Sequence, residues 1–230
     1  MVHIISPHID DAIFSLGGLI HRLTDRHKEI FITYVFTISE WVNEEAPGAA
    51  DVKDRSLISL LRAQEEENVS ALFRYRFEFL NYREHPIRNA DSDQNMVSFL
   101  RSDFNKKVAS GNVCFFPLGI DHPDHIILGN LGAELFSKGH RIFFYEDLPY
   151  AAKRSEENLK LFASLENRKL KPESIPFDID KKIDAMKLYR SQLSPHWEKI
   201  ITNYAYDPKS KTFSERFWKP SNESIIRLDN

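Results

Sequence analysis

The chain has 230 residues, of which 42% are hydrophobic and 28% are charged, so it can bury a substantial core. Its 31 basic and 34 acidic side chains leave a formal charge of −3, which argues against nucleic acid or an anionic membrane as a partner. The single cysteine, Cys114, excludes an intramolecular disulfide and a cysteine-rich zinc module. No apolar run is long enough for a signal-peptide core or a membrane-spanning helix, so we expect a cytoplasmic protein.

The first third of the chain alternates short apolar runs with longer helical patterns. Val2–Ser6 is rich in β-branched residues, which predicts a buried strand. An apolar stripe predicts a helix over Ala12–Asp25 with Asp11 as its cap. Ile30–Phe36 is dense in β-branched and aromatic residues, which indicates a second strand, and a long helical pattern covers Asp51–Leu72.

The middle third repeats this alternation. We expect strands over Phe77–Leu80, Val113–Phe116 and Arg141–Tyr145, and helices over Gln94–Ser110, closed by Gly111, and Ile126–Lys138. Alternation of this kind predicts an α/β fold, Rossmann-like, with a mostly parallel sheet and helices on both faces.

The pattern is looser after Tyr150. Helices are predicted over Lys153–Leu165 and Ile179–Ser191, and the segment between them contains two prolines. The tail from Lys199 to Asn230 is polar, with aromatic residues spaced through it. We therefore expect one domain over residues 1–230, in which residues 151–230 form a helical and irregular C-terminal extension packed on the sheet.

Two loops of the predicted sheet are crowded with groups that can bind a metal. The sequence SPHIDD follows the first strand, and GIDHPDH (119–125) follows the strand at Val113–Phe116. Sites in open parallel sheets form at the carboxyl ends of strands, and neighbouring strands would bring these loops together. Each loop alone is also compatible with an ordinary turn, but their pairing at equivalent strand ends favours a metal or catalytic site.

The residue types narrow the metal. Histidine nitrogen and carboxylate oxygen without thiolate suit Zn²⁺, with Fe²⁺ or Mn²⁺ as alternatives, better than Ca²⁺ or Mg²⁺. Three protein ligands and one open position are typical of a hydrolytic zinc site. The two loops offer more candidates than three ligands, which leaves groups for proton transfer and for stabilising an oxyanion.

Several segments resemble one enzyme family. SPHIDDAIFSLGG resembles the His-Pro-Asp-Asp motif and downstream Gly-Gly of the PIG-L/LmbE-like zinc-dependent N-deacetylases, and HPDH at 122–125 resembles their second motif. LLRAQEEENVSALF at 60–73 is similar to the family's helix with an Arg-x-x-Glu pattern. FYEDLPY, KLYRSQ and SERFW are similar to segments of a bacterial branch, so the resemblance covers most of the chain.

The resemblance implies roles for the two loops. His8, Asp11 and His125 would bind Zn²⁺, and Asp10 would be the general base that takes a proton from the zinc-bound water. The first motif departs from the family at Ile9, where proline is usual, so the rigidity of this loop must come from elsewhere.

Two further residues of the second motif complete the implied machinery. His122 would stabilise the tetrahedral oxyanion as imidazolium or protonate the leaving amine, and Asp124 would orient that histidine.

Residues outside the two loops carry weaker signals. Arg62 and Glu65 share a helix face, so they form either a surface ion pair or, as the resemblance implies for Arg62, part of the substrate pocket. Glu146 and Asp147 follow the strand at Arg141–Tyr145 and would bind sugar hydroxyls or cap a loop; we take Glu146 as a substrate-binding candidate.

The remaining histidines form no constellation. His196 and Trp197 belong either to a pocket rim or, more simply, to the packing of the extension. The others are expected to be structural or at the surface: His3, His21, His27, His85 and His140.

Together these features predict a zinc-dependent N-deacetylase. The expected substrate is a small N-acetylated amino sugar or glycoconjugate, such as a sugar nucleotide, a glycolipid precursor or a glycoside. The alternatives are hydrolysis of another amide or ester bond and a non-catalytic sugar-binding member of the fold. A phosphate-binding loop is excluded because Gly17 and Gly18 come too late after the first strand and no lysine follows them. A dinucleotide-binding module is excluded because no G-x-G-x-x-G follows that strand.

Overall fold

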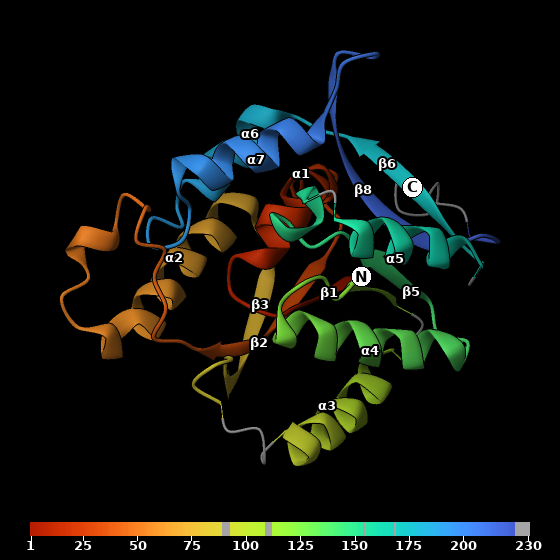
Figure 1. The fold of residues 1–230 in the computed structure, drawn as a ribbon, viewed down its shortest axis with the longest axis horizontal. Coiled ribbons are helices and arrows are strands. Elements are labelled where there is room, and N and C mark those ends of the chain that lie inside the picture. Colours follow the sequence, from red (N-terminus) through yellow and green to blue (C-terminus); the bar gives the residue numbers. More distant parts are fainter. Residues whose placement is uncertain (89–92, 109–111, 154, 168, 224–230) are drawn as a thin grey trace.

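The computed structural model of the chain describes residues 1–88, 93–108, 112–153, 155–167 and 169–223. Its centre is a sheet in which the strands lie in the order β3-β2-β1-β4-β5-β8-β6, and β7 pairs with β8 outside this path (Figure 1). Five strands are mutually parallel: β1 (Val2–Ser6), β2 (Ile30–Ile38), β3 (Arg76–Arg83), β4 (Val113–Pro117) and β5 (Ile142–Tyr145). The predicted α/β fold with a mostly parallel sheet is therefore confirmed.

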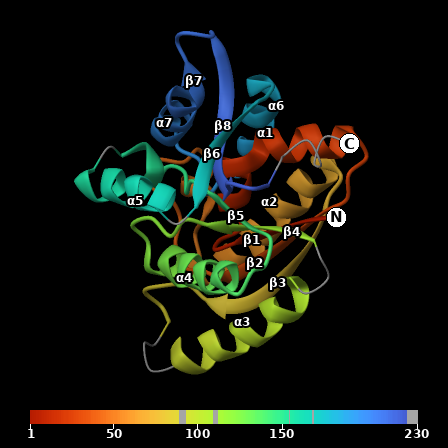
Figure 2. The ribbon, with the colours of Figure 1, turned by 90° about the vertical axis from the view of Figure 1, so that its right-hand side faces the viewer.

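Helices cover both faces of the sheet, as Figure 2 shows. On one face lie α1 (Asp11–Asp25), α2 (Ile58–Phe73) and α6 (Ile179–Met186). On the other face lie α3 (Asp93–Val108) and α4 (Pro123–Ser137). Because both faces are covered, β1 and β4 are buried along their whole length, which explains why most of their residues are apolar.

The position of β1 determines where the two motif loops lie. β1 pairs with β2 on one side, with Val2 opposite Ile30, and with β4 on the other, with Val2 opposite Val113. Because these strands run parallel, the loop after β1 and the loop after β4 emerge at the same edge of the sheet. Both motif loops therefore meet there.

The C-terminal part of the chain differs from the prediction. Residues 151–230 were expected to be helical and irregular, but two strands here extend the sheet. β8 (Thr212–Pro220) pairs antiparallel with β5, and β6 (Leu170–Pro176) pairs antiparallel with β8. Two prolines hide β6 in the sequence; they are tolerated because β6 lies at the end of the strand order and pairs on one side only. Residues 224–230 of the predicted tail lie outside the described residues.

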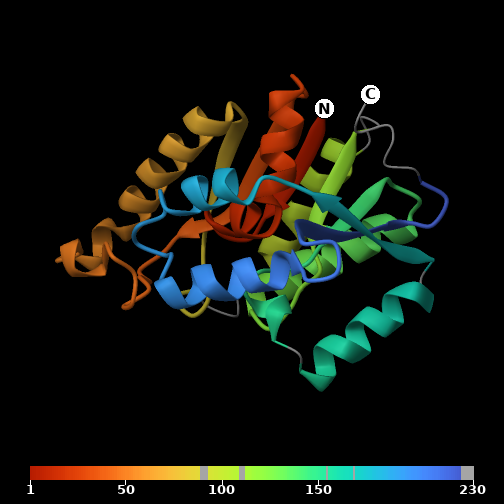
Figure 3. The same ribbon diagram turned by 90° about the horizontal axis from the view of Figure 1, so that it is seen from above.

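The remaining C-terminal elements are two helices and a short strand. α5 (Glu156–Asn167) contacts β6, and α7 (Pro195–Ala205) contacts β8 and precedes the short strand β7 (Tyr206–Asp207). Seen from above, α7 crosses the side of the sheet toward which β1 runs (Figure 3). None of the described helices has the length and apolar character that crossing a bilayer would require.

Three helix boundaries differ from the prediction in ways that matter for the site. α2 begins at Ile58, because two 3-10 turns over Ala49–Asp51 and Arg55–Leu57 replace the predicted first turns. α6 ends at Met186 and leaves the next eight residues as a loop. α4 begins at Pro123, three residues earlier than predicted, since proline suits the first helical turn. The predicted closure of α3 at Gly111 lies outside the described residues.

Candidate active site

A cavity of about 320 Å³ opens at the edge of the sheet where the motif loops meet. Five of the eight predicted site residues line it: His8, Asp10, Asp11, Arg62 and His122. Such a volume lies at the lower end of the range for small-molecule sites. The site therefore has room for a small ligand next to the predicted metal-binding groups.

The loop after β1 holds its shape through packing and one hydroxyl group. Ile9, which stands where the family usually has proline, is 1% exposed and belongs to the core. Ser6 Oγ donates to the carbonyl oxygen of His8 (2.7 Å) and accepts from the N–H of Ala12 (3.1 Å). Asp11 does not cap α1 as predicted: it is the first helical residue, and its Oδ2 accepts from the N–H of His8 at 2.9 Å.

The side chains of His8, Asp11 and His125, here called the ligand cluster, converge on one point. Asp11 Oδ2 lies 3.0 Å from His8 Nδ1 and 3.1 Å from His125 Nε2. Ligands of a tetrahedral zinc ion with bonds of about 2.1 Å are roughly 3.4 Å apart, so this spacing is close to that of a bound site. His125 Nε2 is buried, and its contact with Asp11 Oδ2 does not have the geometry of a hydrogen bond. These donors fit a divalent metal ion.

His122 is a further candidate for the same ion. One nitrogen from each of His8, His122 and His125 lies within 4.8 Å of the other two. We favour Asp11 as the third ligand because its Oδ2 is the nearer group to both imidazoles and its negative charge offsets that of a cation.

The electrostatic field of the ligand cluster favours positive charge. Burial disfavours a charged imidazole, but the Asp11 carboxylate outweighs it and raises the pKa of His8 to about 9. Burial also disfavours a charged imidazole at His125, but the carboxylates of Asp11 and Asp147 outweigh this effect and raise the pKa of His125 to about 10. The negative charge that holds protons on these rings is the charge that a metal cation would neutralise.

Asp147 supports the ligand cluster from behind, a role that the sequence analysis missed. Its Oδ1 lies 2.6 Å from His125 Nδ1, and its Oδ2 accepts from the N–H of Gly119 at 3.0 Å. A carboxylate on the second ring nitrogen fixes the orientation of a metal-binding histidine. The one feature of the sequence that could have indicated this role is the position of Asp147 just after β5, because β5 lies next to β4 in the sheet.

Asp124 lies closer to His8 than to the histidine it was expected to orient. Its Oδ2 is 3.1 Å from His8 Nε2 but 4.0 Å from His122 Nδ1. Oδ2 also accepts from the N–H of His85 (2.9 Å), and Oδ1 lies 2.6 Å from Arg88 Nη1. Burial opposes ionisation, but these contacts outweigh it and lower the pKa of Asp124 to about 2.

His122 is held by the backbone of its own motif. Its Nδ1 accepts from the N–H of Asp124 at 3.2 Å, so a neutral ring carries its proton on Nε2. Burial, together with His8 and His125, lowers the pKa of His122 to about 4. This arrangement favours a neutral Nε2–H donor over the imidazolium that the resemblance implied.

Arg62 is buried and contacts the predicted base directly. Its Nη2 lies 2.9 Å from Asp10 Oδ1, and Nη1 reaches Ser39 Oγ (3.2 Å) and Glu84 Oε2 (3.5 Å). Glu65 does not pair with Arg62; its carboxylate accepts from the N–H and hydroxyl of Ser191. The surface ion pair is therefore wrong, and the pocket alternative agrees with the position of Arg62.

The position of Arg62 sets the charge around Asp10. Burial raises the pKa of Asp10, and the nearby carboxylate of Asp11 adds to this effect. The guanidinium of Arg62 acts in the opposite direction. Burial outweighs the guanidinium, so the pKa of Asp10 lies above its ordinary value, and a carboxylate with a raised pKa suits proton transfer.

Glu146 does not reach the cavity. It is 2% exposed, and its carboxylate accepts from Arg216 Nε (2.6 Å), Trp218 Nε1 (2.9 Å) and Tyr204 Oη (2.5 Å). These three donors lie on β8 and α7, so Glu146 ties the end of β5 to the C-terminal elements. We correct the expected contact with substrate for this reason.

Several residues at the cavity were not predicted. His85, expected to be structural or at the surface, lines it together with Trp41, Tyr150 and Gln192. Trp197 lines it as well, which favours the pocket-rim alternative for that residue. They come from loops after three different strands and from the α7 region, and no local sequence pattern connects them.

Comparison with known proteins agrees with this site. The model of the PIG-L family, described as GlcNAc-PI de-N-acetylase, matches residues 3–136. The chain belongs to the PIG-L family. The matched segment includes both motif loops and Arg62, whereas Gln192 and Trp197 lie beyond it. No match was found among curated protein sequences.

Solved structures share the fold at low sequence identity. The A40926 pseudoaglycone deacetylase Dbv21 has a TM-score of 0.72 at 20% identity, over 95% of this chain and 96% of its own. N,N'-diacetylchitobiose deacetylase from Pyrococcus horikoshii has a TM-score of 0.60 at 20% identity, and the match covers 96% of this chain and 84% of that protein. The 4-carboxy-2-hydroxymuconate hydratase GalB from Pseudomonas putida has a TM-score of 0.62 at 13% identity, and the match covers 95% of this chain and 94% of that protein. Since one of these is a hydratase, the likeness shows the fold and leaves the reaction to the site.

Proposed function

We propose that this member of the PIG-L family is a metal-dependent hydrolase that removes an N-acetyl group from a small amino-sugar substrate. Water adds to the carbonyl carbon, the C–N bond breaks, and acetate and a free amine result. The observation that carries the proposal is the convergence of the ligand cluster beside Asp10, a buried carboxylate that lines the same cavity. The family and the deacetylases of the same fold support this reaction over others.

We infer that His8, Asp11 and His125 hold the metal, with Zn²⁺ as the first candidate and Fe²⁺ or Mn²⁺ as alternatives. When bound, such an ion supplies a Lewis acid that polarises a carbonyl group and makes water more acidic. Asp147 keeps His125 in the required orientation through the contact with its Nδ1.

The other side chains of the site handle protons and orientation. Asp10 Oδ1 pairs with Arg62, and Asp10 Oδ2, the other oxygen of this carboxylate, accepts the proton of the attacking water. His122, with its proton on Nε2, donates a hydrogen bond to the oxyanion, and Asp10 then returns its proton to the leaving amine. Arg62 orients Asp10 and faces the substrate in the cavity.

Acetate release tests the proposal. The metal-stripped protein, alone and with Zn²⁺, Fe²⁺ or Mn²⁺ restored, is assayed on N-acetylglucosamine, its glycosides and an acyl ester of similar size. We expect release from the N-acetylated sugars only after metal is restored. Phe99→Ala, at an exposed site on α3, serves as the control variant and should behave as the parent protein. Hydrolysis of the ester alone would contradict the proposal.

A further inference from the structure

An exposed aromatic surface lies at the mouth of the candidate active site. The rings of Trp41 and Trp197 stack with centroids 5.9 Å apart and an angle of 23° between their planes. Both residues line the cavity, and Trp41 is 42% exposed. An exposed tryptophan beside a cavity whose floor is polar is unlike the scattered surface apolar residues of an ordinary protein. The mouth of the site therefore offers a flat aromatic face to a ligand.

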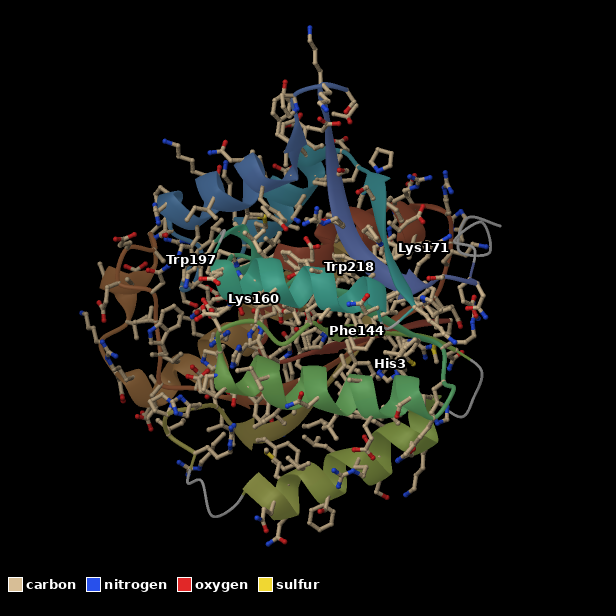
Figure 4. All side chains as sticks on the ribbon, turned by 45° about the vertical axis from the view of Figure 1, so that its right-hand side comes forward. His3, Phe144, Lys160, Lys171, Trp197 and Trp218 are labelled. Carbon is tan, nitrogen blue, oxygen red and sulfur yellow. The ribbon has the colours of Figure 1, made fainter. Side chains whose placement is uncertain are left out.

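This aromatic pair is held in place by the core. The ring of Trp197 makes an edge contact with Phe14 of α1, with centroids 6.5 Å apart. The backbone N–H of Trp197 donates to Ser194 Oγ at the start of α7. Figure 4 shows Trp197 at the end of α7 remote from the β7–β8 hairpin and well apart from Trp218 on β8. Because Trp197 cannot move freely, Trp41 stacks on a fixed surface.

The backbone of Trp41 is tied to the same network as the predicted base. Its N–H donates to Ser39 Oγ at 3.1 Å. That hydroxyl accepts from Arg62 and donates to Glu84 (2.5 Å). Since Arg62 pairs with Asp10, the aromatic face has a defined position relative to the predicted reaction centre. Pre-organisation of this kind favours binding because little side-chain freedom is lost.

Gln192 adds a polar group to this surface. It is fully buried, and its Nε2 donates to Ser191 Oγ (2.9 Å) and to the carbonyl oxygen of Trp41 (3.4 Å). Within the described part of the chain its Oε1 has no hydrogen-bond partner, although the residue lines the cavity. A buried acceptor without a partner is costly, so this oxygen is suited to a ligand hydroxyl or N–H.

We propose that Trp41, Trp197 and Gln192 form a subsite for a second pyranose ring attached to the N-acetylated sugar. The C–H face of a pyranose packs on an aromatic ring while its hydroxyls satisfy an acceptor such as Gln192 Oε1. An alkyl aglycone would use the aromatic face but leave Oε1 buried without a partner. The inference rests on the proposed function. Trp197 and Gln192 lie beyond the segment that the family model matches, so this subsite concerns the substrate specificity of this chain and not a feature of the matched family segment.

The first test compares substrates in wild type and variants. We measure kcat/KM for N-acetylglucosamine, a disaccharide of two N-acetylglucosamine units, and octyl N-acetylglucosaminide. In Trp41→Leu, which keeps an apolar side chain but no flat face, the ratio of disaccharide to monosaccharide should fall roughly tenfold. Trp41→Phe should recover most of that ratio, Gln192→Ala should lower it, and Phe99→Ala should leave it unchanged.

The second test measures binding without turnover. Metal-stripped protein is titrated calorimetrically with the same disaccharide and monosaccharide, and Trp41→Leu should abolish the preference for the disaccharide. If no substrate is deacetylated but this preference and its loss are observed, the proposed function fails and the subsite stands. An unchanged preference in Trp41→Leu, or a loss confined to the octyl glycoside, overturns the subsite.

Discussion

Two clusters of buried charged side chains differ in how fully their polar atoms are paired. Lys182 and Glu215 lie at most 3% exposed; Lys182 Nζ is 2.6 Å from Glu215 Oε1, and the two carboxylate oxygens also accept from the N–H groups of Gly18 and Leu19. The candidate active site instead leaves Arg62 Nε and Gln192 Oε1 buried without hydrogen bonds to described residues. A closed cluster of this kind stabilises the fold, whereas an open one is suited to bind something else.

The closed cluster also supports the open one. Glu215 holds the middle of α1, the helix that begins with Asp11, and so fixes the direction of the chain that carries a predicted metal ligand. Gly18 is required there because a Cβ atom would lie 2.2 Å from Cγ of Phe177. The Gly-Gly of the first motif thus permits close packing of α1 against the segment before α6.

The largest effect is expected from removing the predicted base. Asp10→Asn keeps an oxygen for Arg62 but cannot accept a proton, so kcat/KM for the N-acetylated sugar should fall by about 10²- to 10⁴-fold. Bound metal, measured by elemental analysis, should stay at the wild-type level. The thermal midpoint should be unchanged or higher, because open sites of this kind are not optimised for stability. More than a tenth of wild-type activity would contradict the role of Asp10.

Breaking the closed cluster of Lys182 and Glu215 should lower the stability of the fold. Glu215→Ala leaves Lys182 Nζ buried without a carboxylate, which costs about 3–5 kcal/mol of unfolding free energy. For a chain of this size that corresponds to a fall of roughly 6–20 °C in the thermal midpoint, measured by calorimetry. Glu156→Ala is the matched control, because it breaks an exposed pair with Lys160 and should cost less than about 1 kcal/mol. Equal losses in the two variants would remove the distinction.

A smaller effect is expected behind the ligand cluster. Asp147→Asn keeps a hydrogen bond to His125 Nδ1 but removes the negative charge, so metal affinity should fall about 10- to 100-fold. Competition with a chelator measures this change. Glu146→Gln, the neighbouring buried carboxyl that does not reach the cavity, should leave metal affinity as in the parent protein. A similar loss in both variants would point to a general disturbance of the loop after β5.

The smallest effect concerns a second closed cluster. Glu66 is buried and accepts from Tyr75 Oη (2.7 Å) and Tyr189 Oη (2.5 Å), and burial raises its pKa to about 8 despite these hydrogen bonds. Between its ordinary pKa of about 4.3 and this value, the folded state binds more protons than the unfolded state. The free energy of unfolding should therefore fall as the pH rises through this window.

Glu66→Gln should flatten that decline, which urea unfolding between about pH 5 and pH 8 would measure. Glu67→Gln, at the exposed neighbouring position, should keep the wild-type slope. If both variants keep it, Glu66 does not titrate in this range.

The parallel sheet and the motif loops were predictable because their signals are local. A buried strand such as Val2–Ser6 is a short run rich in β-branched residues, and the metal-competent residues follow such runs directly. β6 escaped because Pro172 and Pro176 normally exclude a strand, and only its edge position makes them acceptable. Helix ends were predictable only approximately, since capping and packing decide them.

What the sequence by itself determined is the chemistry of the two loops: imidazoles and carboxylates at the ends of two strands that a parallel sheet brings together. Tertiary structure alone decided which groups act on them. The pairs Arg62–Asp10 and Asp147–His125 join residues 52 and 22 positions apart, and Gln192 reaches the loop of Trp41 across 151 positions. Strand order and helix packing set such contacts, and no periodicity in the chain encodes them.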